Sequence, residues 1–363
     1  MVLAFRIFRA AVHICLCVAI CSTAVKASNL LDDLVISECD PSGPALVIYI
    51  ANKTDVETVA CGAVAPGGRK VTTEDRFLLA SVSKLYLTVS IMQQVEQGKL
   101  ATTDLAADLL PEDIVANLGG LEGITLDHLM RMRSGLPDYL DDQFPDDHLE
   151  MIAQGKSHRD VIRHAMSLIE GRGTTFEPGA SFEYSNTNYL LLQLILEGIT
   201  GQTMSDYFQE HLFKPAGIEH TDLLGYGVTP AEMVEGQEDL GTGNGIESVA
   251  RYHAVYGLGD GALVATAEDV ALFYRALFRD FLLLSRQSVE RMLKDPYADL
   301  YGMGVEVEKV DDTLLVVGHS GEHIGFSSDV RYALDEDVIV VALQARAGSD
   351  LAFTIDIIVD EIE

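Results

Sequence analysis

Ser81 and Lys84 stand three residues apart in the segment ASVSKLYLTVS, residues 80–90, where an apolar helix is predicted to begin. Residues at this spacing share one face of a helix. A serine hydroxyl becomes a nucleophile when a neighbouring base takes its proton, and a lysine can be that base if burial lowers its pKa. The positive end of the helix dipole would also favour an oxyanion at Ser81. The alternative is a helix-capping serine beside a surface lysine.

The segment FEPGASFEYSNTNYLLL, residues 176–192, holds the chain's only Y-x-N pattern, Tyr184 to Asn186, in a loop before an apolar helix. A tyrosine hydroxyl near a serine and a lysine can relay a proton to a leaving group. An asparagine amide can donate to a substrate carbonyl and accept from its N–H. The alternative makes Tyr184 a half-buried aromatic side chain and Asn186 a helix cap or turn residue.

A third polar group, His319-Ser320-Gly321, is predicted at the end of the apolar strand TLLVV. A glycine there would let the backbone approach a ligand closely. His323-Ile324-Gly325 repeats the H-x-G pattern four residues later. The first copy is preferred because it adjoins the strand, and the alternative is a polar strand end with an ordinary histidine.

These three patterns, S-x-x-K, Y-x-N after an EPG turn and H-x-G on a late strand, occur in an order that resembles the serine β-lactamase and penicillin-binding protein family. The closest branch contains class C β-lactamases, D-alanyl-D-alanine carboxypeptidases of the H-x-G type, D-aminopeptidases and related esterases. The resemblance extends over nearly the whole mature chain and includes the segments 133–139, 185–202 and 261–273.

The resemblance implies a role for each matching residue. Ser81 would be acylated, Lys84 would be its general base, and Tyr184 would share in proton transfer. The backbone N–H groups of Ser81 and Glu322 would form the oxyanion hole. The implied substrate-binding residues are Asn186, which would orient the substrate amide, His319, which would stand where relatives place lysine or histidine, Gly321 and Glu322.

Departures from the pattern narrow the choice of chemistry. The chain has no S-D-N and no K-T-G motif, which disfavours a class A β-lactamase. It also has no G-x-S-x-G motif, which excludes the nucleophile elbow of the α/β-hydrolases as the rival serine mechanism. Relatives commonly carry a small or hydroxyl residue at the position of Glu322, close to the substrate's terminal carboxylate. Because like charges repel, Glu322 is predicted to disfavour C-terminal D-Ala-D-Ala and to favour esters or amine-bearing substrates. The alternative is a side chain turned to solvent.

Apolar runs at 44–51 and 58–64 predict an antiparallel hairpin, and strands return after residue 300, before a closing helix. Helical periodicity dominates between about 101 and 299, and the glycine-rich, acidic segment 222–261 reads as a long irregular loop near a binding site. The predicted fold is α/β, an antiparallel sheet built from both chain termini and flanked by helices, with an inserted mostly helical subdomain, as in the β-lactamase and transpeptidase family.

The predicted domains are a signal peptide at 1–27 and a serine hydrolase domain at 28–363, with an α/β lobe at about 28–100 and 300–363 and a helical lobe at about 101–299. Arg6 and Arg9 precede an apolar stretch too short for a stable membrane span. A secreted or periplasmic location follows. After cleavage near Ala27, two cysteines remain, Cys39 and Cys61, and either a disulfide or two unpaired thiols fits them.

The net charge of −31 makes nucleic-acid binding improbable, because such a surface repels phosphates. The acidic segment PDYLDDQFPDDHLE, residues 137–150, matches no calcium-loop spacing and is predicted to be a solvated loop. No metal and no organic cofactor are expected. The expected partner is a small-molecule or peptidoglycan-like peptide substrate.

These features predict a secreted serine hydrolase that forms an acyl-enzyme on Ser81 and acts on an amide or ester, such as a D-amino-acid peptide. Two alternatives remain. One is a class C-like β-lactamase, and the other is a non-catalytic module that binds penicillin or cell-wall fragments.

Overall fold

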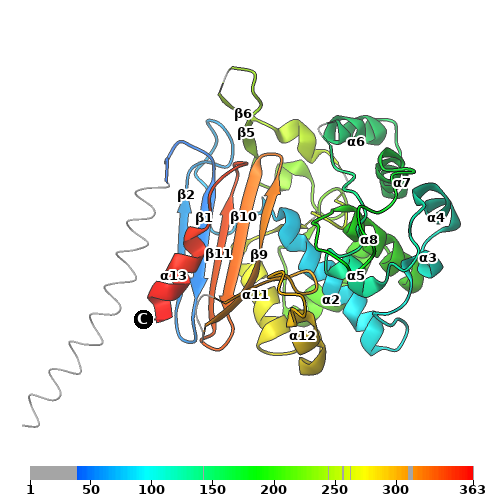
Figure 1. The fold of residues 1–363 in the computed structure, drawn as a ribbon. Coiled ribbons are helices and arrows are strands. Elements are labelled where there is room, and N and C mark those ends of the chain that lie inside the picture. The colour runs from blue at the N-terminus through cyan, green and yellow to red at the C-terminus, as the bar shows by residue number, and fades with distance from the viewer. Residues whose placement is uncertain are drawn as a thin grey trace, which may run out of the picture.

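The computed structural model describes residues 39–141, 143–243, 245–255, 257–261, 263–309 and 314–362 (Figure 1). The predicted signal peptide, residues 1–27, lies outside the described residues.

A six-stranded antiparallel sheet forms one side of the molecule, in the order β2-β1-β11-β10-β9-β8 (Figure 1). β1, from the start of the chain, pairs with β11, from its end, with Leu46 opposite Gln344. The predicted sheet built from both termini is therefore confirmed. Its strands are β1 (Leu46–Ala51), β2 (Val56–Cys61), β8 (Glu306–Lys309), β9 (Leu315–His323), β10 (Phe326–Ala333) and β11 (Val338–Gln344).

Helices cover both faces of this sheet because its central strands are apolar on both sides. In β1, Ile48 and Ile50 belong to a small core with the C-terminal helix α13 (Phe353–Ile362). The alternate residues Val47 and Tyr49 face the main core, where α11 (Ala267–Phe278) packs on β1 and β11. Helix α11 therefore belongs with the sheet, although residues 101–299 were predicted as one helical lobe.

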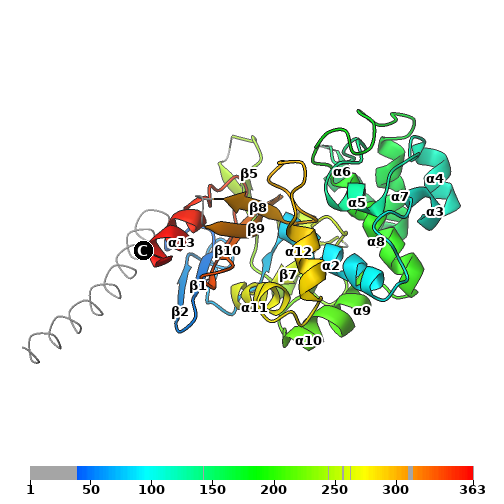
Figure 2. The same ribbon diagram turned by 60° about the horizontal axis from the view of Figure 1, so that its bottom comes forward.

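The remaining helices gather on the side of the sheet opposite α13 (Figures 1 and 2). They are α2 (Ser83–Glu96), α3 (Ala106–Leu109), α4 (Glu112–Leu118), α5 (Leu126–Met130), α6 (Phe144–Ala153), α7 (His158–Leu168), α8 (Thr187–Thr200), α9 (Met204–Phe208), α10 (Lys214–Ala216) and α12 (Arg286–Leu293), with the π-helical turn η2 (Gln209–Phe213) after α9.

The central helix α2 differs from its prediction in two respects. Periodicity predicted one buried face, but every residue from Ser83 to Met92 is buried, because α2 lies between α8 and other elements of the main core. Ser81 precedes this α-helix in a short 3-10 helix, η1 (Ala80–Val82), instead of beginning it. Ser81 is therefore held by the turn that enters α2.

Two acidic segments contain more regular structure than predicted. Residues 144–153, read as a solvated loop, form the helix α6, which buries Phe144 and His148. The segment 222–261 contains β4 (Asp222–Leu223), which joins β3 (Phe77–Leu78) and β7 (Leu263–Ala265) in a second sheet. It also contains η3 (Pro230–Glu232), a hairpin of β5 (Gln237–Asp239) and β6 (Ile246–Ser248), and η4 (Ala250–His253).

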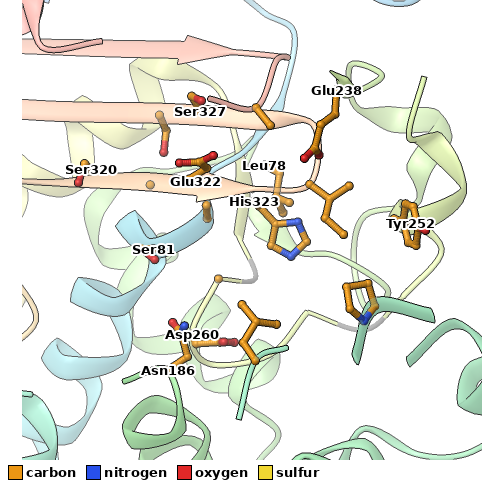
Figure 3. Close-up of a pocket in the computed structure, with 18 of the residues that line it drawn as sticks. Leu78, Ser81, Asn186, Glu238, Tyr252, Asp260, Ser320, Glu322, His323 and Ser327 are labelled. Carbon is orange, nitrogen blue, oxygen red and sulfur yellow. The ribbon is translucent and has the colours of Figure 1, made fainter. Parts of the chain in front are cut away.

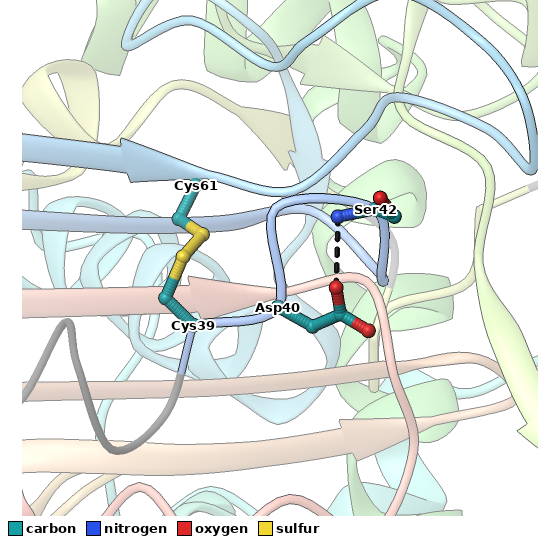
Figure 4. The surroundings of a disulfide bond; sticks show 4 residues. All are labelled: Cys39, Asp40, Ser42 and Cys61. Atoms are coloured by element: carbon teal, nitrogen blue, oxygen red, sulfur yellow. Dashed lines mark hydrogen bonds between the residues drawn. A yellow bond between two sulfur atoms is a disulfide. The ribbon is translucent and has the colours of Figure 1, made fainter.

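Cys39 and Cys61 form a disulfide that joins the start of the described chain to the end of β2 (Figure 4). In the turn that follows Cys39, the backbone N–H of Ser42 donates to Asp40 Oδ1 at 2.9 Å. Of the two alternatives for these cysteines, a disulfide or two unpaired thiols, the structure shows the disulfide. Within the described ranges, no helix is long and apolar enough to cross a membrane.

Candidate active site

A cavity of about 1330 Å³ opens between the sheet and the helices (Figure 3). The sequence-predicted residues that line it come from η1, from the loop before α8 and from β9: Ser81, Tyr184, Asn186, His319, Gly321 and Glu322. Lys84 lies beneath Ser81 and is fully buried. The structure therefore brings all seven predicted site residues to one place, although they span 242 positions of the chain, from 81 to 322.

Ser81 and Lys84 are in direct hydrogen-bond contact. The ammonium Nζ of Lys84 lies 2.8 Å from Ser81 Oγ and 2.6 Å from the backbone carbonyl oxygen of Asp260. Ala80, just before Ser81, adopts a φ of 48°, a region that non-glycine residues seldom occupy. This turn takes the chain from β3 into η1 and directs Ser81 into the cavity.

Burial lowers the pKa of Lys84 to about 8, while the negative charges of Asp260 and Asp138 act in the opposite direction. A lysine with this pKa is roughly one-tenth neutral at pH 7, far more than a solvent-exposed lysine. Lys84 is therefore able to accept a proton from Ser81. Burial also raises the pKa of Asp260, whose carboxylate accepts a hydrogen bond from the Tyr139 hydroxyl at 2.7 Å.

Tyr184 completes the group around the nucleophile. Lys84 Nζ lies 5.1 Å from the centroid of its ring. Burial of the hydroxyl raises the pKa of Tyr184 far above its usual value, and a hydrogen bond with Ser81 opposes this rise only in part. The phenol therefore stays protonated at neutral pH. It can pass on a proton through its O–H, but it is a poor candidate for a phenolate base.

The Asn186 side chain is fixed by Asp138. Its Nδ2 donates to Asp138 Oδ2 at 2.8 Å, and its backbone N–H donates to the same oxygen at 3.2 Å. Because a carboxylate only accepts, this contact sets the orientation of the amide. The amide oxygen Oδ1 is thereby left for another donor, such as a substrate N–H.

His319 uses both ring nitrogens within the protein. Nδ1 lies 2.5 Å from the carbonyl oxygen of Ser320, and Nε2 lies 3.0 Å from the hydroxyl of Tyr301. Burial lowers the pKa of His319 to about 4, so the ring is neutral, Nδ1 carries its proton and Nε2 accepts from Tyr301. In this arrangement His319 has no nitrogen free for a substrate, and it packs edge-on against Tyr184 instead.

Gly321 allows β9 to approach the nucleophile. A Cβ atom on this residue would lie 3.1 Å from Ser81 N and 2.6 Å from the carbonyl oxygen of Leu79. Glycine was predicted here for close approach to a ligand, whereas the atoms nearest to an added Cβ belong to the protein itself, in Ser328, Leu79 and Ser81. The predicted end of the strand at Gly321 was wrong, because β9 continues to His323.

The backbone N–H of Glu322 points toward the open edge of β9. Ser320 N donates to Glu306, on the neighbouring strand β8, at 3.1 Å. Alternate residues of a strand point their N–H groups to the same side, so that of Glu322 also points away from β10. β8 pairs with β9 only as far as Gly318, and η1 lies against β9 beyond that point. The N–H groups of Ser81 and Glu322 thus border the same space.

Sequence reasoning missed four residues that hold this site together: Tyr139, Asp138, Asp260 and Tyr301. Asp138 and Tyr139 lie in the segment RSGLPDY, which the resemblance includes but to which no role was given. Asp260 contacts Lys84 through a backbone carbonyl, which any residue type would supply. Among the described residues, no cluster of three or more His, Cys, Asp or Glu side chains is placed to hold a metal ion.

Comparison with known proteins agrees with this geometry. The Beta-lactamase family model matches residues 34–361, so the chain belongs to the β-lactamase family. The prediction of a β-lactamase-related serine hydrolase is thereby confirmed at the level of the family, and so is the predicted fold.

Two curated relatives are informative. A penicillin-binding protein of Bacillus subtilis is 28% identical over 77% of this chain and 62% of its own length. A D-aminopeptidase of Cereibacter sphaeroides is 28% identical over 76% of this chain and 51% of its own length. The chain therefore spans only about half to three-fifths of the length of these relatives.

Solved structures share the fold. A penicillin-binding protein from Bacillus halodurans has a TM-score of 0.74 at 24% identity, covering 87% of this chain and 95% of that one. A D-amino acid amidase from Ochrobactrum anthropi SV3 has a TM-score of 0.74 at 18% identity, covering 94% of this chain and 98% of that one.

Proposed function

We propose that the protein is a secreted serine hydrolase that forms an acyl-enzyme on Ser81 and cleaves an amide or ester bond, such as that of a D-amino-acid amide or peptide. The observation that carries this proposal is the contact of 2.8 Å between Ser81 Oγ and the buried Lys84 Nζ, whose pKa is lowered to about 8. A nucleophile in contact with a base that can be neutral is the arrangement that acyl transfer requires.

In the proposed acylation step, Ser81 Oγ attacks the substrate carbonyl carbon while its proton moves to Lys84 Nζ. The N–H groups of Ser81 and Glu322 donate to the oxyanion. As the tetrahedral intermediate collapses, the leaving nitrogen or oxygen takes a proton that Lys84 releases through the Tyr184 hydroxyl. Water then attacks the acyl carbon and gives its proton through the Tyr184 hydroxyl to Lys84. Collapse of this second tetrahedral intermediate breaks the bond to Ser81 Oγ, which takes the proton back from Lys84 as the acid product leaves.

The charge of the cavity argues for substrates without a free carboxylate beside the scissile bond. Among the described residues, its lining contains one cationic side chain, Arg331, which already pairs with Glu306 and Asp329. The acidic lining residues are Asp141, Glu238, Asp239, Asp260, Glu306, Glu322, Asp329 and Asp350. This surface favours a neutral or amine-bearing substrate, which fits the name of the D-aminopeptidase relative better than a carboxypeptidase role.

The exposed carboxylate of Glu322 contributes to this preference at the cavity wall. Replacing Glu322 with threonine should raise kcat/KM for peptides ending in D-Ala-D-Ala, because a negative charge near their terminal carboxylate is removed. Glu322→Gln, which keeps the size of the side chain, separates charge from shape. An unchanged or lower kcat/KM for these peptides in both variants would contradict this role of Glu322.

The proposed reaction is tested by steady-state hydrolysis of a simple p-nitrophenyl ester and of D-amino-acid amides by the mature chain and its Ser81→Ala variant. Hydrolysis that is lost in Ser81→Ala supports the proposal. Hydrolysis of neither substrate class, together with retained binding of penicillin, would favour a non-catalytic binding module. Rapid Ser81-dependent opening of penicillins would instead identify a β-lactamase.

The disulfide and the predicted signal support the proposed secretion. A bond between Cys39 and Cys61 persists in an oxidising compartment outside the cytoplasm. A mature N-terminus near residue 28 in the culture medium or periplasm, determined by N-terminal sequencing, is the expected result.

A further inference from the structure

The carboxylate of Glu306 lies at the cavity wall and accepts hydrogen bonds from two other residues of that wall. Its Oε1 accepts from the backbone N–H of Ser320 at 3.1 Å and from the Ser320 hydroxyl at 2.9 Å. Its Oε2 accepts from Nη1 of Arg331 at 2.5 Å. All three residues line the cavity, so three donors converge there on one carboxylate. No step of the proposed acyl transfer uses this carboxylate.

These three donors have the chemistry of an anion-binding site. A guanidinium, a hydroxyl and a backbone N–H that point at one carboxylate form charge-assisted hydrogen bonds, the strong contacts by which proteins bind anions. Burial disfavours the charge of Glu306, but His319 in its protonated form, Arg331 and the N–H of Ser320 lower its pKa to about 2. Glu306 is therefore ionised at neutral pH, and its own carboxylate is the anion that the three donors hold.

The donors lie close to the nucleophile along β9. Ser320 and Glu322 are two residues apart, so their N–H groups point to the same edge of the strand, about 7 Å from each other. β8 begins at Glu306, opposite Gly318, so this strand does not extend along the edge to Ser320. Figure 3 shows Ser320 and Glu322 on the strand that passes Ser81. A substrate whose carbonyl oxygen accepts from the N–H of Glu322 therefore has its neighbouring groups within reach of Ser320.

The three donors would open to the cavity if the side chain of Glu306 were shorter. Ser320 is exposed, and the Glu306 side chain keeps 28% of its surface accessible. Arg331 is also held from its other side by Asp329, whose Oδ1 lies 2.8 Å from Nη2. The guanidinium would therefore keep its position after the loss of Glu306, and its Nη1 would be free for another anion.

We propose that Ser320 and Arg331 form an anion-binding site beside the nucleophile, that the Glu306 carboxylate fills it, and that Glu306 thereby excludes substrates with a carboxylate near the scissile bond. The proposal deepens the proposed function and rests on it, because the exclusion concerns a substrate whose carbonyl lies at Ser81. Glu322 only repels a carboxylate, whereas Glu306 also occupies the groups that would bind one.

The filled site is tested with acetate, a free carboxylate of the same kind as the side chain of Glu306. Acetate should raise the Tm of Glu306→Ala by about 2 °C or more over an equal concentration of chloride, because it binds the vacated donors in the folded protein. The wild-type protein should show no such difference. Glu308→Ala, the matched control, removes a carboxylate of the same strand that does not line the cavity, and it should show none either.

The exclusion of substrates is tested by binding in a Ser81→Ala background, where turnover does not interfere. Calorimetry compares a peptide that ends in D-Ala-D-Ala with the same peptide as its C-terminal carboxamide. Adding Glu306→Ala should shift the ratio of the two dissociation constants by about tenfold or more in favour of the carboxylate, the effect of hydrogen bonds to a charged group. Glu308→Ala should leave the ratio unchanged. Glu306→Gln removes the charge but still fills the site, so a smaller shift without any acetate effect is expected.

Two results would overturn the proposal. One is a Tm of Glu306→Ala that responds equally to acetate and chloride. The other is a ratio of dissociation constants that stays at the value of the Ser81→Ala parent after Glu306→Ala and after Glu306→Gln, and the glutamine variant alone decides if the alanine variant does not fold. Failure of the proposed function appears separately, as absence of Ser81-dependent ester hydrolysis in the wild-type protein, because neither the Tm nor the binding ratio depends on turnover.

Discussion

Lys84 must be buried and close to neutral in order to act as a base, and both conditions come from its place at the start of α2. The positions around it are filled by Ser81, by the carbonyl oxygen of Asp260 and by the rings of Tyr184 and Tyr189. None of these contacts is a direct ion pair with a carboxylate. Burial therefore dominates, and the pKa of Lys84 falls to about 8.

This pKa predicts the pH dependence of acylation. A base is active when it is deprotonated, so kcat/KM for an ester should rise as the pH increases through about 8 and level off above that value. The measurement is kcat/KM from pH 5 to pH 10. Lys84→Arg, which stays protonated, should lower kcat/KM by about 100-fold or more over the whole range. A flat profile, or an active arginine variant, would contradict the assignment of Lys84 as the base.

At the scale of the elements, the site depends on the close contact between β9 and η1. Gly321 has no side chain to separate them, and the Ser328 hydroxyl on β10 donates to the carbonyl oxygen of Leu79 at 2.7 Å. These contacts position the N–H groups of Ser81 and Glu322 relative to each other. A small displacement of β9 would separate the two donors, and oxyanion stabilisation is sensitive to such distances.

Gly321→Ala should therefore reduce catalysis more than stability. The added Cβ, 2.6 Å from the Leu79 carbonyl oxygen, forces β9 and η1 apart and should lower kcat by about 100-fold, with about 1–3 kcal/mol lost from the free energy of unfolding. Enzyme kinetics and chemical denaturation measure the two effects. Gly198→Ala in α8, where an added Cβ meets nothing within 4 Å, is the matched control. It should leave kcat unchanged and raise the free energy of unfolding by up to about 1 kcal/mol, because alanine is favoured over glycine inside a helix. Normal turnover by Gly321→Ala would show that the close approach is not needed.

The elements that were predicted well are those whose apolar residues follow a clear period. The antiparallel hairpin of β1 and β2 and the strands after residue 300 appear where the apolar runs predicted them. α6 was missed because acidic residues dominate its sequence, while burial of Phe144 and His148 depends on tertiary neighbours. Motifs identified six of the residues that line the cavity, but not Asp138 or Tyr301, whose roles arise from contacts between distant segments.

At the scale of the whole molecule, the disulfide and the antiparallel pairing of β1 with β11 hold the ends of the chain to one sheet. Cys39 and Cys61 are 22 residues apart in sequence. Closing a loop of this length in the unfolded chain corresponds to about 3 kcal/mol of stabilisation in the chain-entropy account. Neither cysteine lines the cavity, so the bond is expected to affect stability alone.

The free energy of unfolding of the double variant Cys39→Ser, Cys61→Ser should therefore be about 3 kcal/mol lower than that of the wild-type protein. Its kcat/KM should be the same at a temperature where both proteins are folded. Denaturant unfolding with and without a reducing agent is the measurement. Reduction should destabilise the wild-type protein and leave the double variant unchanged. A wild-type protein insensitive to reduction would contradict the stabilising role of the disulfide.

The acyl-enzyme on Ser81 is the central claim, and intact-mass spectrometry of the mature chain incubated with a penicillin tests it most directly. A mass increase equal to one penicillin, seen early or persistently, located on the peptide that contains Ser81 and absent from Ser81→Ala, is the predicted result. The same experiment times deacylation, since a long-lived adduct indicates a peptidase or esterase and a short-lived one a β-lactamase. A wild-type chain that stays unmodified at all times and also fails to hydrolyse a p-nitrophenyl ester, or an adduct that also forms on Ser81→Ala, would contradict the account.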